Sequence, residues 1–152
     1  STIANYLDIL EETYVAHVIK PYSTYHPTEI IAAPKVYIFD TGFICYYRGW
    51  HDLRSEDLGI LWEHFVLNQL HIHLQSRDHI HYWRDKQGHE IDFIISRRGR
   101  SPLAIETKWA YKEFNPANLK IFLRHYPKSD VLLITQDVTE PFNKRFGDIQ
   151  VQ

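Results

Sequence analysis

Two short segments of this 152-residue chain carry acidic residues and a lysine at a spacing suited to metal-ion chemistry. The first, residues 90–95, contains Asp92, and the second, residues 103–108, contains Glu106 and Lys108. Because side chains alternate between the faces of a strand, Glu106 and Lys108 should point the same way, and a neighbouring strand would bring Asp92 beside them. Two carboxylates can hold a hard divalent cation, and a nearby lysine can orient or deprotonate a water. This is the minimum equipment for hydrolysing a phosphodiester.

A third carboxylate, Glu63, lies in a segment where apolar residues repeat every three or four positions, residues 56–70. This period is typical of a helix packed on one face. A carboxylate against an apolar face needs a partner, and a metal ion or a lysine from a neighbouring sheet would supply one. The alternative is that Glu63 lies on the solvent-exposed edge of the apolar stripe.

The elements that would position these side chains show clear helix and strand patterns. Apolar residues every three or four positions predict helices, and short apolar or alternating runs between polar turns predict strands. These patterns predict helices at residues 56–76 and 116–125, and strands at residues 79–84, 90–96, 102–109 and 131–135. We therefore predict an α/β fold in which helices flank a mixed sheet of four or five strands.

The N-terminal segment has a different pattern. Residues 1–12 read as a helix, and residues 13–21 and 29–39 as the two strands of a hairpin. This order resembles the last helix and the wing of a winged-helix module. The first twelve residues contain no Lys or Arg, which favours a connector or packing element over a DNA reader. We predict a connector at residues 1–34 and the main domain at residues 35–152.

The ordered series of Glu63 on a helix, Asp92 on a strand, and Glu106, Thr107 and Lys108 on the next strand resembles the core of the PD-(D/E)XK nuclease superfamily. Holliday-junction resolvases and restriction endonucleases belong to that superfamily. More closely, the chain resembles a domain family of unknown function found C-terminal to AAA-type ATPase modules in bacteria and archaea. The matching stretches are residues 35–43, 59–70, 82–84, 88–93 and 104–108.

This resemblance implies a restriction endonuclease-like core and an activity, Mg²⁺- or Mn²⁺-dependent cleavage of DNA. It implies that Asp92, Glu106 and the backbone carbonyl of Thr107 bind the metal ion. Lys108 would activate the attacking water, and Glu63 would correspond to the helical carboxylate of the resolvase branch. The resemblance also implies an ATPase module in the same full-length chain.

The composition fits one compact domain with a small appendage. Hydrophobic residues make up 44% of the chain and aromatic residues 14%, enough for a packed core. The single cysteine, Cys45, excludes an intrachain disulfide and suits a reducing compartment. No apolar run approaches the roughly 18 residues of a membrane span. We expect a cytoplasmic protein without a membrane segment.

The net charge of −2 gives no sign of nucleic-acid binding, but the charge is unevenly distributed. Residues 1–78 carry five Lys or Arg against ten Asp or Glu, whereas residues 79–128 carry ten against five. A basic region around an acidic pocket would favour a phosphate backbone, and Arg84, Trp109 and Lys112 are candidate DNA contacts. Ordinary scatter of surface charge is the alternative interpretation.

Other interpretations of these residues remain open. A nuclease-like fold can serve as a non-catalytic module that binds DNA or a protein partner. Asp92, Glu106 and Lys108 can also form a purely structural ion-pair cluster. A zinc site is disfavoured: His79 and His81 share a face of a predicted strand, but no cysteine or third ligand is positioned to complete it.

Overall fold

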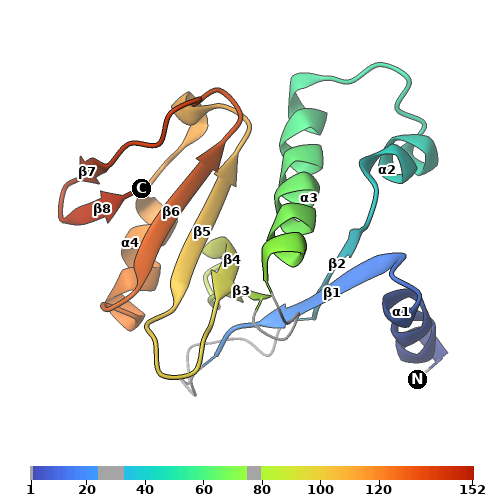
Figure 1. The fold of residues 1–152 in the computed structure, drawn as a ribbon, viewed down its shortest axis with the longest axis horizontal. Coiled ribbons are helices and arrows are strands. Elements are labelled where there is room, and N and C mark those ends of the chain that lie inside the picture. The colour runs from blue at the N-terminus through green and yellow to red at the C-terminus, as the bar shows by residue number, and fades with distance from the viewer. Residues whose placement is uncertain (1, 24–32, 75–79) are drawn as a thin grey trace.

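The computed structural model describes residues 2–23, 33–74 and 80–152 (Figure 1). Its helices are α1 (Thr2–Glu12), α2 (Thr41–Arg48), α3 (Ser55–His73) and α4 (Ala117–His125), with a short 3₁₀ helix at Tyr111–Glu113. Its strands are β1 (Ala16–Pro21), β2 (Lys35–Ile38), β3 (Ile80–Arg84), β4 (Glu90–Ile95), β5 (Leu103–Lys108), β6 (Asp130–Thr135), β7 (Lys144–Phe146) and β8 (Ile149–Val151). None of the described helices is long and apolar enough to cross a bilayer.

The predicted mixed α/β fold is confirmed, and the principal sheet has six strands in the order β2-β1-β3-β4-β5-β6. The β1–β3 and β5–β6 pairs are parallel, whereas the other neighbours are antiparallel. The sheet has more strands than the predicted four or five, because the N-terminal hairpin, β1 and β2, joins it through the pairing of β1 with β3. The predicted domain boundary after residue 34 stays a prediction. Strand β1 lies before this boundary and β2 after it, and the two strands pair with each other.

Most predicted elements of the main domain correspond to observed ones. The helices at residues 56–76 and 116–125 appear as α3 and α4, and the four predicted strands appear as β3 to β6. Residues 75–76 and 79 of these predictions fall outside the described residues, as do residues 29–32 of the predicted N-terminal hairpin. His79, one of the two histidines considered for zinc, is among them.

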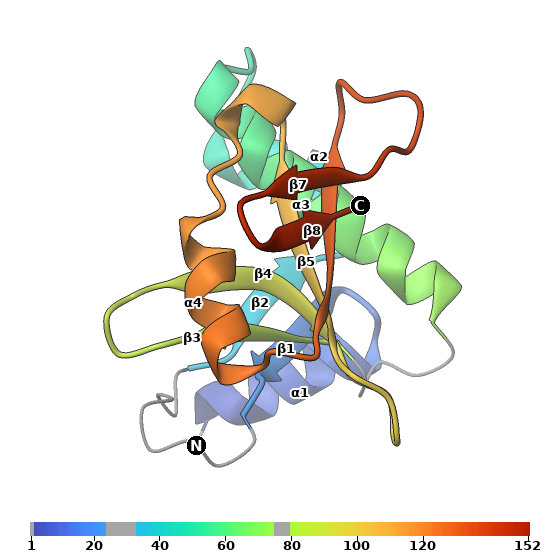
Figure 2. The same ribbon diagram turned by 90° about the vertical axis from the view of Figure 1, so that its left-hand side faces the viewer.

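The two faces of the sheet are covered by different helices (Figure 1, Figure 2). On one face, α3 packs Val66 and Leu67 into a core cluster. On the other face, α4 packs Leu119 and Phe122 into a second cluster. Helices on both faces explain why β3, β4 and β5 bury apolar side chains on both sides of the sheet.

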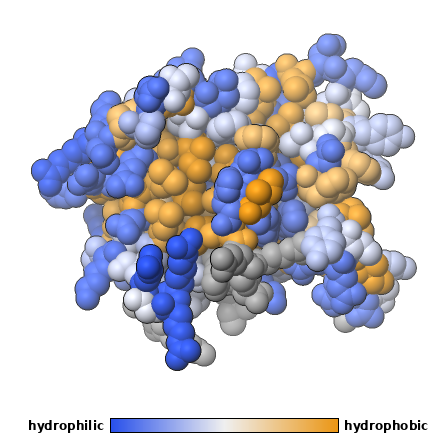
Figure 3. Space-filling model, viewed as in Figure 1, coloured by the Kyte–Doolittle hydropathy of each residue, from blue (hydrophilic) through white to orange (hydrophobic). Residues whose placement is uncertain are grey.

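Helix α3 does not cover its face of the sheet completely. Leu103, Leu132 and Ile134, on β5 and β6, pack against the α3 cluster but remain half-buried. Figure 3 shows apolar surface over this part of the sheet. The edge strand β6 is therefore less deeply covered than the interior strands β3, β4 and β5.

The start of α3 is fixed by a buried carboxylate. Asp57 accepts hydrogen bonds from the backbone N–H of Arg54 at 3.0 Å and from the Arg54 guanidinium at 3.1 Å. These bonds satisfy groups that a helix N-terminus leaves unpaired, and a carboxylate there also suits the helix dipole. The anchored N-terminus sets the position of Glu63 two turns further along α3.

Candidate functional site

A β-bulge in β4 determines where Asp92 points. The register of β4 with β3 shifts by one residue at Asp92 and Phe93. On one side of the shift, Ile91 packs in the α4 cluster, whereas Phe93 packs in the α3 cluster. In a regular strand these two residues would share a face. The extra residue at the bulge reverses the alternation of faces along β4, and this places Asp92 on the α3 side.

Glu106 and Lys108 share a face of β5, as the strand alternation predicted. The Lys108 ammonium donates a hydrogen bond to Glu106 Oε1 at 2.8 Å. Ala104 lies in the α4 cluster and Ile105 in the α3 cluster, so alternation along β5 puts Glu106 and Lys108 on the α4 side.

The expectation that Asp92 joins Glu106 and Lys108 on one face differs from the structure. The β4–β5 ladder places Phe93 opposite Ile105, so Asp92 and Glu106 are the next residues along their strands. In a regular antiparallel pair such residues point to the same side. The bulge reverses this relation, and Asp92 and Glu106 approach the end of the ladder from opposite faces.

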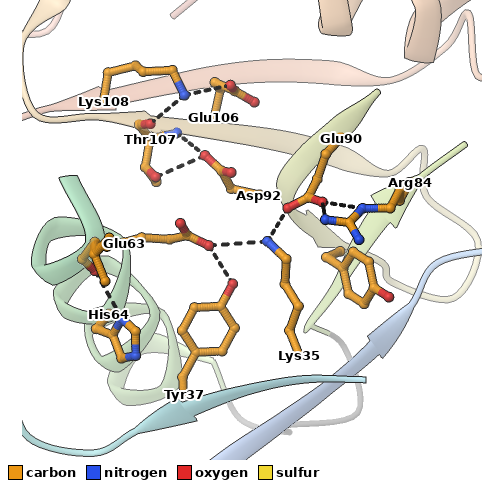
Figure 4. Close-up of polar contacts among 12 residues, drawn as sticks. Lys35, Tyr37, Glu63, His64, Arg84, Glu90, Asp92, Glu106, Thr107 and Lys108 are labelled. Carbon is orange, nitrogen blue, oxygen red and sulfur yellow. Dashed lines mark hydrogen bonds and ion pairs between the residues drawn. The ribbon is translucent and has the colours of Figure 1, made fainter. Parts of the chain in front are cut away.

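Thr107 connects the two sides of the site (Figure 4). Its backbone N–H donates to Asp92 Oδ2 at 2.8 Å, and its hydroxyl donates to the same oxygen at 2.9 Å. Its backbone carbonyl accepts a hydrogen bond from Lys108 Nζ at 3.0 Å. The site is thus built around the backbone of β5, just beyond the last β4–β5 pair.

Glu63 reaches the α3 side of the site from its helix. Its Oε1 accepts hydrogen bonds from the Tyr37 hydroxyl and from Lys35 Nζ, the latter at 3.3 Å. Lys35 also forms an ion pair with Glu90 of β4 (Figure 4). The sequence interpretation assigned no role to Lys35, Tyr37 or Glu90, although Lys35 and Tyr37 lie two apart on a strand and so share a face.

Burial and repulsion by a neighbouring carboxylate raise the pKa values of both central carboxyls. The pKa of Asp92 is raised mainly by burial and then by the Glu63 carboxylate. Burial, with the Asp92 carboxylate second, raises the pKa of Glu106 to about 7. Burial alone would lower the pKa of Lys108, but Glu106 and Asp92 raise it, so its ammonium form is favoured.

Asp92, Glu106 and Lys108 therefore interact electrostatically although they do not share one face. The Asp92 carboxylate raises the pKa of Glu106, and both carboxylates raise the pKa of Lys108. Lys108 in turn lowers the pKa of both carboxyls, against the larger effect of burial. The structure brings the four predicted site residues together, with Glu63 and Asp92 on the α3 side and Glu106 and Lys108 on the α4 side.

One buried carboxylate oxygen of the site bears on whether a cation could bind there. Among the described residues, no group of three or more His, Cys, Asp or Glu is placed to hold a metal ion. Glu106 is only 5% exposed, and its Oε2 has no hydrogen-bond partner in the described part of the chain. A buried carboxylate oxygen without a donor is costly, and a cation would remove that cost.

Lys108 occupies the oxygens that the resemblance assigns to the metal. Its ammonium contacts Glu106 Oε1 and the Thr107 carbonyl, two of the three expected ligand groups. A divalent ion at these oxygens would require the Lys108 side chain to move.

The candidate DNA contacts have different surroundings. Arg84 forms an ion pair with Glu90, and its side chain is 46% exposed. The Trp109 ring packs edge-on against Trp62 of α3 at 6.0 Å between ring centroids. Lys112 is exposed in the short 3₁₀ helix that follows β5. Arg84 and Lys112 are therefore accessible to a ligand, whereas Trp109 is half-buried.

Sequence comparisons place this fold in a family. Residues 58–151 match the domain of unknown function DUF4143, a domain often found with AAA ATPases, and the chain belongs to this family. Residues 1–54 match a second domain of unknown function, DUF8612. The expected relation to a domain family associated with AAA-type ATPases is confirmed, whereas the relation to PD-(D/E)XK nucleases stays a prediction.

Curated relatives are much longer than this chain. They include an uncharacterized protein of Mycobacterium tuberculosis and one of Mycobacterium bovis, each 34% identical over 112 residues. The match covers 71% of this chain and 25% of each relative, so the chain spans about a quarter of their length. No solved structure matches the chain.

Proposed function

We propose that this domain hydrolyses DNA phosphodiesters with the help of Mg²⁺ or Mn²⁺. The observation that carries the proposal is the buried Glu106 Oε2, which has no hydrogen-bond partner among the described residues. The other oxygen of this carboxylate pairs with Lys108, and the nearby Asp92 raises the pKa of Glu106. Asp92, Glu106 and the Thr107 carbonyl would hold the ion just beyond the end of the β4–β5 ladder, which the two carboxylates approach from opposite faces. Carboxylate and carbonyl oxygens are the ligands that such ions prefer.

The raised pKa values of Asp92 and Glu106 support this assignment. Two buried carboxylates that repel one another are stabilised when a positive ion is present, because the charge offsets both desolvation and repulsion. A bound divalent ion would supply the positive charge that stabilises a phosphate as negative charge develops on it.

The remaining side chains have separate roles in the proposal. Lys108, freed from Glu106, would orient the attacking water through its ammonium group. Glu63, on the α3 side with Asp92, would accept a hydrogen bond from a water near the phosphate. Arg84, Trp109 and Lys112 would contact the DNA around the site.

The proposed context of the domain, a larger protein with an ATPase module, rests on the family and not on the site. Because DUF4143 is often found with AAA ATPases, we propose that the domain acts in a larger cytoplasmic protein whose ATPase module shares the same chain. The matched relatives, of which this chain spans about a quarter, are long enough for such an arrangement.

Plasmid nicking tests the proposal. Supercoiled DNA is incubated with Mn²⁺ and the wild type, Asp92→Ala, Lys108→Ala or the control Asp8→Ala, which changes an exposed carboxylate on α1. Nicking by the wild type and the control, but by neither site variant, would support the mechanism. Equal nicking by the wild type and Asp92→Ala would rule it out, provided that circular dichroism shows both proteins folded.

One observation favours the alternative, a non-catalytic binding module. Lys108 already neutralises Glu106 and contacts Thr107, as a permanent structural ion pair would. Thermal unfolding with added Mn²⁺ separates the two functions. A metal site predicts a higher melting temperature that Glu106→Ala abolishes, whereas a structural ion pair predicts no response to Mn²⁺.

A further inference from the structure

Two side chains of β2 contact the Glu63 carboxylate of α3. Tyr37 Oη donates a hydrogen bond to Glu63 Oε1, and Lys35 Nζ lies 3.3 Å from the same oxygen (Figure 4). Lys35 and Tyr37 share a face because they are two residues apart on a strand. With two donors on one oxygen, the Glu63 carboxylate has a fixed orientation.

Lys35 is enclosed between two carboxylates. Besides Glu63 it pairs with Glu90, which in turn pairs with Arg84. The Lys35 ammonium also lies 5.4 Å from the centre of the Tyr82 ring, and its side chain is only 23% exposed. A lysine so placed has little freedom, and its charge acts within the site rather than in solvent.

The charge of Lys35 acts on one of the proposed metal ligands, Asp92. The favourable influences on the Lys35 ammonium come from Glu63, Glu90 and Asp92. Without this ammonium, the Glu63 and Asp92 carboxylates would repel one another, and Glu90 would keep only its ion pair with Arg84. Lys35 therefore lowers the negative potential of the α3 side of the site.

The two halves of this arrangement lie in different family segments. Lys35 and Tyr37 fall within residues 1–54, which match DUF8612. Glu63, Asp92 and the β5 residues fall within residues 58–151, which match DUF4143. Because β1 and β2 belong to the same sheet as β4 and β5, the first segment completes the surroundings of a carboxylate in the second.

We propose that Lys35 and Tyr37 are positioning residues of a composite site, in which the first family segment orients and electrostatically balances Glu63 of the second. Tyr37 fixes the orientation of the carboxylate, and Lys35 sets the charge that the site presents to a divalent cation. This inference rests on the proposed phosphodiesterase function.

The charge-balancing role of Lys35 and the orienting role of Tyr37 predict different effects of substitution on Mn²⁺ affinity and on turnover. Lys35→Met removes a positive charge, so Mn²⁺ should bind roughly ten-fold more tightly while kcat falls roughly ten-fold or more, because Glu63 loses its fixed position. Tyr37→Phe removes one donor and no charge, so Mn²⁺ affinity should stay within about two-fold while kcat falls with little change in KM. Lys35→Arg should retain wild-type affinity and most of the turnover.

The experiment measures Mn²⁺ binding by calorimetry and plasmid nicking for these three variants and the wild type. Urea unfolding of Tyr37→Phe, Glu63→Gln and the double variant gives the coupling between these side chains independently of activity. Tighter Mn²⁺ binding with slower nicking in Lys35→Met, reversed in Lys35→Arg, would support the inference.

Two negative results are distinguishable. If the wild type binds Mn²⁺ and nicks DNA, but the variants change only the free energy of unfolding, the positioning role is overturned and the proposed function stands. If the wild type neither binds Mn²⁺ nor nicks DNA, the proposed function fails, and any measured Tyr37–Glu63 coupling is purely structural. If Lys35→Met does not fold, Tyr37→Phe still decides between these outcomes, because its kcat falls only if Tyr37 positions Glu63 for turnover.

Discussion

The backbone N–H of Thr107 donates to the side chain of Asp92 at 2.8 Å, where a continuing ladder would offer a backbone carbonyl of β4. The Thr107 hydroxyl donates to the same Asp92 oxygen at 2.9 Å. A carboxylate therefore ends the β4–β5 ladder, and it is held there by two donors from one residue. This contact, together with the bulge in β4, sets the position of Asp92 relative to Glu106.

Replacing Thr107 by Val tests the strength of this contact. The change keeps the shape of the side chain but removes the hydroxyl donor to a carboxylate in a residue that is only 6% exposed. We expect the free energy of unfolding to fall by about 1–3 kcal/mol in urea titrations. Thr107→Ser, which keeps the hydroxyl, should lose clearly less. Equal losses in both variants would show that packing of the methyl group, not the hydrogen bond, holds this residue.

The raised pKa of Glu106 predicts that the metal-free domain is less stable at higher pH. The pKa is about 7 in the folded protein against the ordinary value of 4.5, so folding favours the protonated form. The contribution of Glu106 to the free energy of unfolding is fully present below pH 4.5. It is lost as the pH rises through about 7, and the total loss is up to roughly 3 kcal/mol. Asp92, whose pKa is also raised, contributes with the same sign.

Urea unfolding at pH 5.5 and pH 8 without metal measures this dependence. Glu106→Gln, which stays neutral, should show a smaller fall in the free energy of unfolding over this interval than the wild type. The same fall in both proteins would mean that other groups cause it and that Glu106 does not titrate with a raised pKa.

The turn between β3 and β4 should be sensitive to the loss of Asp85. Its buried carboxylate accepts hydrogen bonds from the backbone N–H groups of Gln87 and His89 at 2.9 Å, and it contacts the His89 ring at 2.6 Å. Asp85→Ala leaves these donors unpaired and should lower the free energy of unfolding by about 2–3 kcal/mol. Lys86→Ala, at an exposed position of the same turn, is the matched control and should change it by less than about 0.5 kcal/mol.

The central elements of the fold could be predicted from local patterns. Apolar periodicity located α3 and α4, and alternation with polar turns located β3 to β6. The alternation also correctly placed Glu106 and Lys108 on one face, because β5 pairs with β6 without irregularity over all its residues. These features depend on neighbouring residues in the chain, which is why the sequence reveals them.

The face of Asp92 could not be predicted, because it depends on a bulge. A shift of one residue turns a strand over, and nothing in the local pattern of residues 90–95 distinguishes a regular strand from a bulged one. The parallel pairing of β1 with β3 was equally hidden, because it joins segments about sixty residues apart. Lys35 and Tyr37 carried a usable signal, their spacing on a strand, but their partner Glu63 depends on the docking of α3.

The most direct test of the central claim is a crystal structure of the domain grown with Mn²⁺. We predict anomalous density for Mn²⁺ at about 2.0–2.3 Å from oxygens of Asp92 and Glu106 and from the Thr107 carbonyl, with Lys108 displaced from Glu106. Crystals of Asp92→Ala grown under the same conditions should lack that density. Wild-type crystals in which no ion is bound and Lys108 still contacts Glu106 and Thr107 would contradict the account.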